Sequence, residues 1–498
     1  MASRENGIKK DYILLLLVGI CLSIAQFVMI RDFVTILYGE EVVIVLVTAA
    51  FFSGLSLGYL LSLKFSRKVF EISFLVSVFL HLTFPFSYRY LAAGISTLDN
   101  EGVWYMVLMF GYAFVFSSIF ATFLPRLAAQ NDSDMSPEQR LKILYSVELL
   151  GFALGFTIVG WSWNQPLSHL LPVYWFILGI ILHLTLRKKA VSAAFFLTVF
   201  VAVTFLDPMD KQSTAILYKM KHGKKNPRVL LSINSAYQKV EVIEDARGKR
   251  YLYLDGLQNL NAGDLKELNY YIAEVPASLV RPRKTLLVGN GTLSSVPKVY
   301  PFSGDVVSVE LDSGVLLAGQ KAFTPPESLA SLDRWRLIVD DGKHFLRSNR
   351  ETFDLIIMDI PSPLTIQEAL LHTVEFYELA SRRLSPEGVI SIQLSGPLAR
   401  NNRTPARVVA ALNKVFREVM VIYSKKADRG FAYASNHLPF TEEQCLSVTR
   451  DHEKRLKIIP RNKVSSYLKK ATPLATDNLD LVLRRGLERF LDRYFDYD

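Results

Sequence analysis

Long apolar runs fill the first 206 residues of this chain, and a different pattern follows them. The runs have membrane-spanning length, whereas the remainder alternates short apolar strands with amphipathic helices and charged loops. The pattern predicts a multi-span α-helical membrane domain over residues 1–206, with six or seven spans. The candidate spans are about 12–30, 41–63, 70–87, 103–124, 144–162, 167–186 and 189–206.

Basic residues beside these runs indicate how the chain is oriented. They precede the first run and follow the second, fourth and sixth, which predicts a cytoplasmic amino terminus. A seventh span would send the following domain outside, yet five lysines after it, between 211 and 225, favour the inside. Three alternatives stay open: run 189–206 lies in the interface, one span is miscounted, or the domain is external. We favour a cytoplasmic domain.

Small residues spaced four apart in two runs predict close helix packing. Gly54 and Gly58 share one helix face, as do Gly151 and Gly155, so a neighbouring backbone can approach each pair. Glu148 is a polar residue within an apolar run. We interpret it as forming an interhelical hydrogen bond or lying at the interface, rather than as part of a transport pathway. A transport function therefore has little support.

The region after the apolar runs predicts an α/β domain built in two parts. A basic linker over 207–228 leads to a small β domain over 229–264, which has turn signals at Ala246-Arg-Gly248 and Asp255-Gly256. Residues 265–498 then predict a doubly wound parallel sheet. Its apolar strands read as unbroken runs because both faces of such a sheet are buried, and ligands collect at the carboxyl ends.

Four of these strands end in glycine or a carboxylate. Gly289-Asn-Gly291 follows the first strand and gives a tight turn that a ligand can approach, although an ordinary loop would also explain it. Glu310 ends the next strand, where an acid accepts hydrogen bonds from ribose hydroxyls. Asp341 could accept from an adenine amine or merely form a turn. Asp359 could be a general base or a helix cap. Together these residues favour an adenosine-type nucleoside site.

Composition excludes several other functions. The formal charge of +10 could suggest nucleic acid, but the basic residues cluster beside apolar runs, which indicates topology or anionic lipid instead. Only two cysteines occur, Cys21 inside the first apolar run and Cys445 in the soluble half, so neither a disulfide framework nor a cysteine metal site is expected. No phosphate-binding Gly-x-x-x-x-Gly-Lys loop, zinc motif or histidine cluster occurs, so no metal is expected. His344 and His372 are single residues, interpreted as structural.

The soluble part resembles the spermidine synthase (polyamine aminopropyltransferase) family over about 229–440, in the arrangement of bacterial proteins that attach such a domain to a multi-span region. No single matching segment is specific, but their order and spacing are. The segments are Ser235-Ala-Tyr-Gln238, Leu254-Asp-Gly256, the glycine turn, Val309-Glu-Leu-Asp312, Asp341-Gly342, Asp354-Leu-Ile-Ile-Met-Asp359, Glu375-Phe-Tyr-Glu-Leu379 and Leu384-Ser-Pro-Glu-Gly-Val389, with Thr476-Asp-Asn478 near the end.

The resemblance implies that the small β domain is followed by a Rossmann-like, methyltransferase-type sheet over residues 265–498. It also implies a reaction and a role for each matched residue. In that family an aminopropyl group moves from decarboxylated S-adenosylmethionine to a diamine such as putrescine, and no metal takes part. By motif, Gln238 and Glu310 would contact the nucleoside and its ribose, and Asp341 the adenine. Asp359 would take the proton from the attacking amine, because an ammonium has no lone pair.

Two departures from the family pattern weaken the expected diamine site. The family's glycine loop carries an acid where this chain has Thr292, and a second amine-binding acid is replaced by Ser362. Leu268 and Asn269 stand where the family has a Tyr-His pair. Each charge-assisted hydrogen bond contributes roughly 1.5–3 kcal/mol, so nucleoside binding is better supported than diamine binding.

Three functions therefore stay open. The first is a membrane-anchored aminopropyltransferase-like enzyme, or a different S-adenosylmethionine-using transferase. The second is a catalytically silent sensor or scaffold that binds a nucleoside, and the third, least supported, is a transporter with a regulatory domain. We expect a multi-pass protein of the bacterial inner membrane whose partners are the lipid bilayer, an amine and a nucleoside cosubstrate, with no nucleic acid; homo-oligomerisation stays open.

Overall fold

The computed structural model describes residues 2–38, 40–129, 136–361, 363–394, 396–399, 402–426, 428–449 and 456–495. These residues form two compact units, each described here by itself. The first comprises Met1–Gly248, Tyr253–Leu257 and Phe490–Asp498, and the second comprises Lys249–Leu252 and Gln258–Arg489. The first unit therefore extends beyond the predicted end of the membrane domain at residue 206 and includes the first strands of the small β domain.

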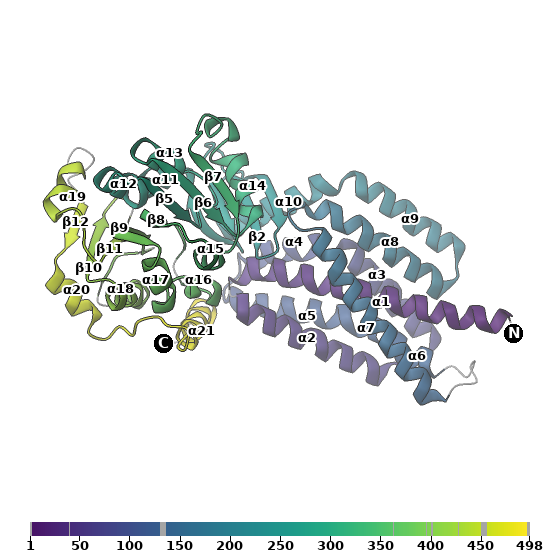
Figure 1. Cartoon of the computed structure of the whole chain (residues 1–498). Helices are drawn as coiled ribbons and strands as arrows, with labels where there is room; N and C mark the ends of the chain where they lie inside the picture. The colour runs from purple at the N-terminus through teal and green to yellow at the C-terminus, as the bar shows by residue number, and fades with distance from the viewer. Residues whose placement is uncertain are drawn as a thin grey trace. The chain divides into compact units, whose positions relative to one another are not determined.

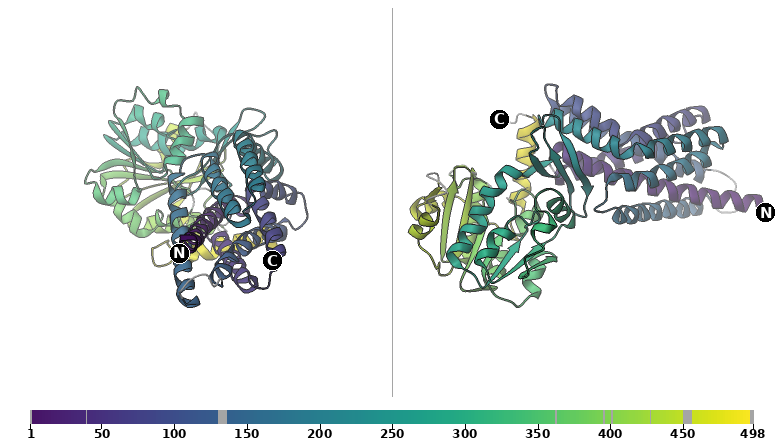
Figure 2. Two further views of the ribbon diagram at one scale, coloured as in Figure 1. Left: turned by 90° about the vertical axis from the view of Figure 1, so that its right-hand side faces the viewer. Right: turned by 90° about the horizontal axis from the view of Figure 1, so that it is seen from above.

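Helices make up most of the first unit (Figure 1). Figure 2 shows them lying side by side as a bundle. Two antiparallel strands follow the last of these helices: β1 (Arg228–Asn234) and β2 (Lys239–Glu244). The helices are α1 (Ala2–Leu37), α2 (Glu40–Leu61), α3 (Arg67–Thr83), α4 (Phe86–Ile95), α5 (Glu101–Ala121), α6 (Phe123–Ala128), α7 (Pro137–Trp161), α8 (Leu167–Leu186), α9 (Lys189–Thr204) and α10 (Leu206–Lys221).

The length and composition of these helices can be compared with the predicted membrane spans. Among the described residues, five helices are long and apolar enough to cross a membrane, or up to seven if each of two bent pairs is one span. The bent pairs are α3 with α4, at 77°, and α9 with α10, at 66°. The predicted runs 70–87 and 189–206 fall on these pairs. Pro85 lies at the first bend and Pro208 in the first turn of α10, where a missing N–H is tolerated.

The paired glycines lie where two helices approach closely, as their spacing predicts. A Cβ on Gly54 or Gly58 of α2 would come within 2.3 Å of a backbone oxygen of α5. A Cβ on Gly151 of α7 would lie 2.2 Å from the Leu16 carbonyl oxygen of α1, and one on Gly155 would meet Ser23. A larger side chain at any of these positions would separate the helices.

A network of buried charged side chains joins α1, α4, α10 and β2 within the first unit. The Arg89 guanidinium contacts Asp32 at 2.8 Å and Asp210 at 2.5 Å. Lys239 contacts the same Asp32 at 2.5 Å and Glu241 at 3.5 Å. All five side chains are buried. Each charge has an opposite partner, which is the condition for keeping a charge away from water.

The second unit is built on an eight-stranded sheet in the order β12-β10-β11-β9-β8-β5-β6-β7. Strands β9, β8, β5, β6 and β7 are parallel, whereas β11, β10 and β12 add to one side of them antiparallel. The predicted parallel sheet is thus correct for one part, and the complete sheet is mixed. The strands are β5 (Lys284–Val288), β6 (Asp305–Glu310), β7 (Trp335–Val339), β8 (Phe353–Met358), β9 (Leu384–Gln393), β10 (Glu418–Ser424), β11 (Arg429–Ser435) and β12 (Leu456–Ile459).

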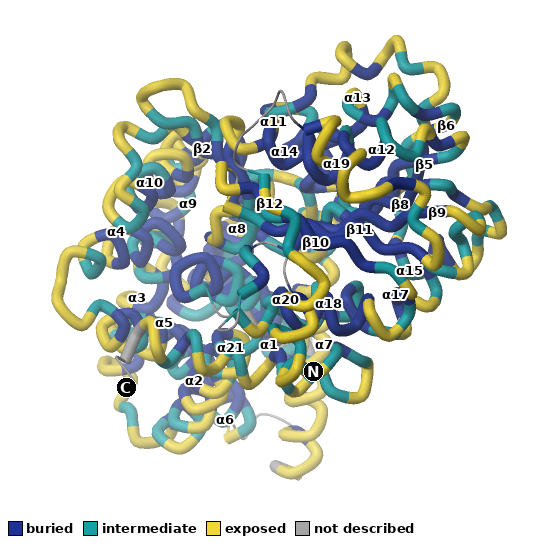
Figure 3. The backbone as a smooth tube through the Cα atoms, turned by 90° about the vertical axis from the view of Figure 1, so that its left-hand side faces the viewer, coloured by how far each residue is buried: buried dark blue, intermediate teal, exposed yellow. Residues whose placement is uncertain are grey.

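Helices cover both faces of this sheet and bury its apolar strands (Figure 3). One core joins the sheet to α15 (Gly342–Ser348), α17 (Val374–Ser381) and α18 (Arg403–Val415); the other joins it to α12 (Val275–Val280), α13 (Val296–Val299) and α14 (Ser313–Ala322). Four further strands form a separate sheet in the order β1-β2-β3-β4, which includes β3 (Arg250–Leu254) and β4 (Leu257–Asn261). The remaining helices are α11 (Ala262–Asn269), α16 (Ile366–Leu370), α19 (Glu442–Thr449), α20 (Arg461–Leu468) and α21 (Asp480–Phe495).

Candidate active site

The carboxyl ends of four adjacent parallel strands bring the predicted site residues of the second unit to one edge of the sheet. Gly289, Glu310 and Asp359 follow or end β5, β6 and β8, and Asp341 follows β7. Backbone hydrogen bonds extend the register to this edge: the Gly289 N–H donates to Val309, and the Asp359 N–H donates to Val288, both at 3.0 Å. Parallel strands place such residues side by side, which is where ligands bind in open α/β sheets.

The turn after β5 requires glycine at two positions. Gly289 has φ +78°, and a Cβ there would lie 2.8 Å from Cγ1 of Ile360. A Cβ on Gly291 would lie 2.4 Å from Cγ1 of Val315 and 3.2 Å from Oε2 of Glu310. The second glycine therefore lets the turn pass directly beside the Glu310 carboxyl.

Glu310 is a buried carboxyl that accepts a backbone hydrogen bond. Its Oε1 accepts from the Asp312 N–H at 3.0 Å. Burial raises the pKa of Glu310 to about 7, and the negative charges of Asp312 and Asp359 act in the same direction. Hydrogen bonds from two hydroxyl groups would stabilise the ionised form of such a carboxyl, because they would replace the hydrogen bonds to water that burial removes.

Asp359 is a second acid with a raised pKa at the same edge. Burial raises its pKa to about 6, against the opposing effect of Arg429. Its Oδ1 accepts from the Gln393 side-chain amide at 3.1 Å, and the Gln393 carbonyl oxygen accepts from Arg429 at 2.9 Å. A carboxylate with a pKa near neutrality, held by a neighbouring amide, suits a general base.

Asp341 caps a helix in this structure. Its Oδ1 accepts from the backbone N–H groups of Lys343 and His344, at 2.6 and 3.2 Å, where α15 begins. The Asp341 side chain is exposed. The cap accounts for its position after β7, so a contact with adenine stays a prediction.

Thr292 is held within a hydroxyl and amide network. Its Oγ1 shares a hydrogen bond of 2.7 Å with Ser294, whose hydroxyl accepts from the Asn269 amide at 2.9 Å. The Asn269 carbonyl oxygen accepts in turn from Ser295 at 2.9 Å. Asn269, at a position where the resemblance expects a different pair, therefore fixes the loop that carries Thr292.

Two other predicted residues, Gln238 and Ser362, are not among the described residues of the second unit. Gln238 belongs to the first unit, where its N–H donates to the Ser235 hydroxyl at 3.0 Å. Ser362 lies outside the described residues. Both assignments stay predictions.

Comparison with known proteins identifies relatives of the second unit. The Spermine/spermidine synthase domain matches residues 267–425. The polyamine aminopropyltransferase of Thermoplasma volcanium is 27% identical over 195 residues, which cover 39% of this chain and 71% of that protein. Polyamine aminopropyltransferase 2 of Pseudomonas aeruginosa is 26% identical over 265 residues, covering 51% and 73%. Residues 267–425 thus match the spermidine synthase family. The resemblance found in the sequence is thereby confirmed.

The similarity to spermidine synthases covers only part of this chain and part of each relative. The polyamine aminopropyltransferase of Leptospira biflexa is 30% identical over 171 residues, covering 33% of this chain and 60% of that protein. Among solved structures, the spermidine synthase of Thermotoga maritima is 21% identical with a TM-score of 0.39, covering 53% of this chain and 88% of that one. The family model matches residues of the second unit, and together with the curated relatives it supports the prediction of a spermidine synthase-like transferase.

Three polar side chains at or near this edge were not predicted from the sequence. Gln393 ends β9, so the rule that identified Asp359 would also have found it. Arg429 begins the antiparallel strand β11, to which that rule does not apply. Asn290 is buried in the glycine turn, and neither atom of its side-chain amide has a partner among the described residues. An unpaired buried amide is a contact that a ligand could complete.

The single histidines and the metal prediction can be compared with the structure. His372 is buried between the Tyr377 hydroxyl and the Pro361 carbonyl oxygen, at 3.0 and 2.9 Å, and burial lowers its pKa to about 4. It therefore has a structural role. Within the described ranges, no group of three or more His, Cys, Asp or Glu side chains is placed to hold a metal ion.

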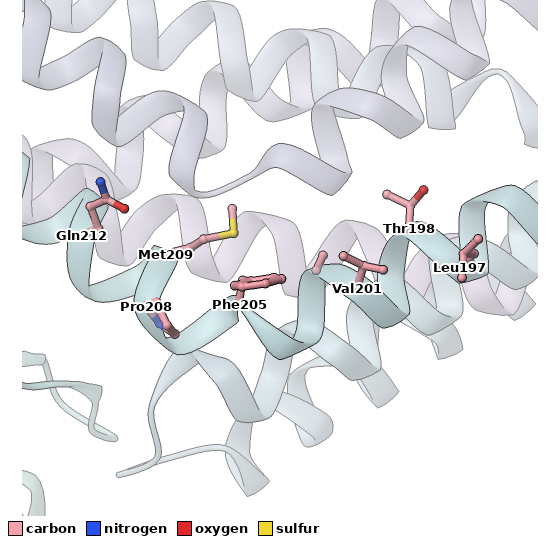
Figure 4. Close-up of a pocket in the computed structure, with 8 residues that line it drawn as sticks. Leu197, Thr198, Val201, Phe205, Pro208, Met209 and Gln212 are labelled. Atoms are coloured by element: carbon pink, nitrogen blue, oxygen red, sulfur yellow. The ribbon is translucent and has the colours of Figure 1, made fainter.

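The first unit contains a cavity of about 680 Å³ at the bend between α9 and α10 (Figure 4). Its lining carries no ionisable side chain, so it supplies no acid or base for a transfer reaction. The lining residues are Leu197, Thr198, Val201, Ala202, Phe205, Pro208, Met209 and Gln212.

Proposed function

We propose that this chain is a membrane-anchored, aminopropyltransferase-like enzyme that transfers an aminopropyl group from decarboxylated S-adenosylmethionine to an amine. The observation that carries the proposal is the pair of buried carboxyls at the carboxyl-terminal edge of the sheet, Glu310 at the end of β6 and Asp359 after β8, with β5 and its glycine turn between them. Glu310 would accept from the ribose hydroxyls, and the glycine turn would let the nucleoside approach the backbone.

Asp359 would act on the attacking amine. The amine nitrogen forms a bond to the propyl carbon next to sulfur, while the carbon–sulfur bond breaks and its electron pair stays on sulfur. The sulfonium thereby becomes the neutral thioether methylthioadenosine, and the proton released by the amine goes to Asp359. A base with a pKa of about 6 is ionised at neutral pH and can accept that proton.

Product formation tests this proposal. Purified full-length protein in detergent would be incubated with decarboxylated S-adenosylmethionine and a panel of amines, and methylthioadenosine would be measured. We expect turnover that Asp359→Asn lowers by about 10²- to 10⁴-fold. Asp305→Asn is a matched control, because Asp305 is exposed at the opposite, amino-terminal end of β6. Equal product from wild type and Asp359→Asn would refute the proposal.

We also propose that the helices of the first unit anchor the enzyme in the bacterial inner membrane, with the second unit in the cytoplasm. Five helices of sufficient length and hydropathy support the anchor. The basic residues beside the apolar runs support the cytoplasmic side, where the nucleoside donor would be available. Reporter fusions at the carboxyl terminus test the side directly, and activity of a periplasmic reporter there would contradict it.

A second candidate is a catalytically silent nucleoside sensor. The network that ties Thr292 to Ser294 and Asn269 favours it, because the loop position expected to hold an amine carries no charge. This candidate predicts calorimetric binding of methylthioadenosine without turnover for any amine. Binding that persists in Glu310→Ala would count against the proposed site in both candidates.

A further inference from the structure

The Arg429 guanidinium lies near the candidate base, Asp359. The resemblance described above implies that the amine acceptors of the family are cationic. Arg429 begins β11, which lies beside β9, and β9 lies beside β8 (Figure 1). Its Nη1 donates to the Gln393 carbonyl oxygen at 2.9 Å, and the amide of the same Gln393 donates to Asp359 at 3.1 Å. Arg429 and Asp359 are therefore two hydrogen bonds apart.

Building on the proposed function, we infer that Arg429 binds a carboxylate of the substrate, so that the reaction uses a carboxylate-bearing amine or donor rather than the fully cationic pair. A diamine next to a guanidinium would meet a like charge, which costs affinity. The replacement of an acid by Thr292 removes the charge that would compensate, and the Thr292 hydroxyl is engaged with Ser294 at 2.7 Å.

The side chain of Arg429 retains the donors that this role needs. A guanidinium has five N–H donors in a planar fork, suited to two parallel hydrogen bonds with a carboxylate. Within the described ranges, one side-chain hydrogen bond of Arg429 is found, that with Gln393. Arg429 is also partly exposed, which leaves it accessible to a substrate.

The positions of the two groups suit an amino acid-like substrate. Asp359 accepts the proton from the amine that attacks, and Arg429 holds the carboxylate through its remaining donors. The reaction balances as in the proposed function: a nitrogen–carbon bond forms, the carbon–sulfur bond breaks, and methylthioadenosine leaves as a neutral thioether. The carboxylate can belong to the acceptor or to an S-adenosylmethionine that has not been decarboxylated.

A four-way assay distinguishes these sources. Full-length protein would be supplied with decarboxylated or intact S-adenosylmethionine, each with putrescine or with 4-aminobutanoate, in which a carboxyl group replaces one aminomethyl end. We expect a pair with one carboxylate to give the highest kcat/KM, at least about tenfold above decarboxylated donor with putrescine. The favoured pair shows whether donor or acceptor carries the carboxylate.

Variants assign the preference to Arg429. We expect Arg429→Gln to lower kcat/KM for the carboxylate-bearing pair by about 10- to 100-fold, as for loss of a charge-assisted hydrogen bond, and to leave or raise the rate with the fully cationic pair. Arg429→Lys should restore part of the preference. Arg382→Gln is a matched control, because Arg382 is exposed at the end of α17. An equal loss with every pair would show a structural role through Gln393 and overturn the inference.

Binding separates failure of this inference from failure of the proposed function. If no pair yields methylthioadenosine, the transferase proposal fails, and calorimetry in the presence of methylthioadenosine still tests the subsite. Binding of 4-aminobutanoate that exceeds that of putrescine and is lost in Arg429→Gln would support the inference without turnover. A wild-type rate that is highest with decarboxylated donor and putrescine or, where no pair turns over, binding of 4-aminobutanoate that does not exceed that of putrescine, would overturn it.

Discussion

Asp359 and Gln393 occupy equivalent places on neighbouring parallel strands and share a hydrogen bond of 3.1 Å. Met358 pairs with Ile392 in the register of β8 and β9, and the next residue on each strand carries the polar side chain. The amide is therefore positioned by the sheet itself. It donates to the candidate base and accepts from Arg429.

Gln393→Leu should impair the base without removing it. The variant keeps the side-chain volume but loses the donor to Asp359, a bond to a charged group worth about 1.5–3 kcal/mol, so we expect kcat/KM to fall about 10- to 100-fold. Loss of a donor to the carboxylate also raises the pKa of Asp359, so the acidic limb of the pH–rate profile should move to higher pH. Gln444→Leu, at an exposed position of α19, is the control. A lower rate with an unmoved acidic limb would contradict the positioning role.

The pH dependence of transfer should report Asp359 directly. Its pKa of about 6 means that the base is protonated below this pH and ionised above it. The rate should therefore rise about tenfold per pH unit below pH 6 and level off above it, measured as kcat/KM between pH 4.5 and 8. A profile that stays flat through pH 6 would remove Asp359 from the role of base.

Binding of the nucleoside should strengthen as Glu310 ionises. Hydroxyl donors favour the carboxylate form, and the pKa of Glu310 is about 7. We expect the affinity for methylthioadenosine, measured by calorimetry, to increase between pH 6 and pH 8 in wild type and to be weak and pH-independent in Glu310→Gln. Tighter binding at pH 6 than at pH 8 would be inconsistent with this contact.

The same pKa affects stability in the opposite direction. Between the ordinary value of 4.5 and about 7, the folded protein retains a proton that the unfolded chain has lost. Stability therefore falls as the pH rises through this range in the absence of ligand, because ionising a buried carboxyl is costly. Glu310→Gln should lessen this fall, as seen in the thermal midpoint measured from pH 5 to pH 8.

The sequence could predict those parts of the fold that depend on local hydropathy. Strands β5, β6 and β8 read as unbroken apolar runs, so Gly289, Glu310 and Asp359 could be assigned to one edge before the structure was known. Hydropathy does not show the direction of a strand, so the antiparallel addition of β10, β11 and β12 was not predicted. An averaged apolar run likewise hides the bends at Pro85 and after Thr204.

The unpredicted part of the candidate site arises from contacts between distant segments. Arg429 reaches Gln393 because an antiparallel strand adds beside β9, and this pairing has no local signal in the sequence. Asn269 reaches Ser294 and Ser295 across 25 and 26 residues. Motif spacing identifies the residues at strand ends, whereas such contacts depend on how the sheet is completed.

Arg89 should be essential for the stability of the first unit. Arg89→Met leaves Asp32 and Asp210 buried without this partner, and breaking a buried ion pair costs about 3–5 kcal/mol. We expect a large fall in the thermal midpoint of the detergent-solubilised protein. Arg67→Met is the control, since the Arg67 side chain is 90% exposed on α3. Equal midpoints for the two variants would show that the buried network contributes little.

Two glycines of α7 should respond to alanine with opposite signs. At Gly151 a Cβ would lie 2.2 Å from the Leu16 carbonyl oxygen of α1, so Gly151→Ala must separate the two helices and lower the thermal midpoint. At Gly160 nothing lies within 4 Å of the added Cβ, so Gly160→Ala gains helix propensity, up to about 1 kcal/mol, without a clash. Both variants add one methyl group to the same helix, so they differ only in what the methyl group meets. If both substitutions lowered the thermal midpoint equally, contact with α1 would not be the reason for the loss at Gly151.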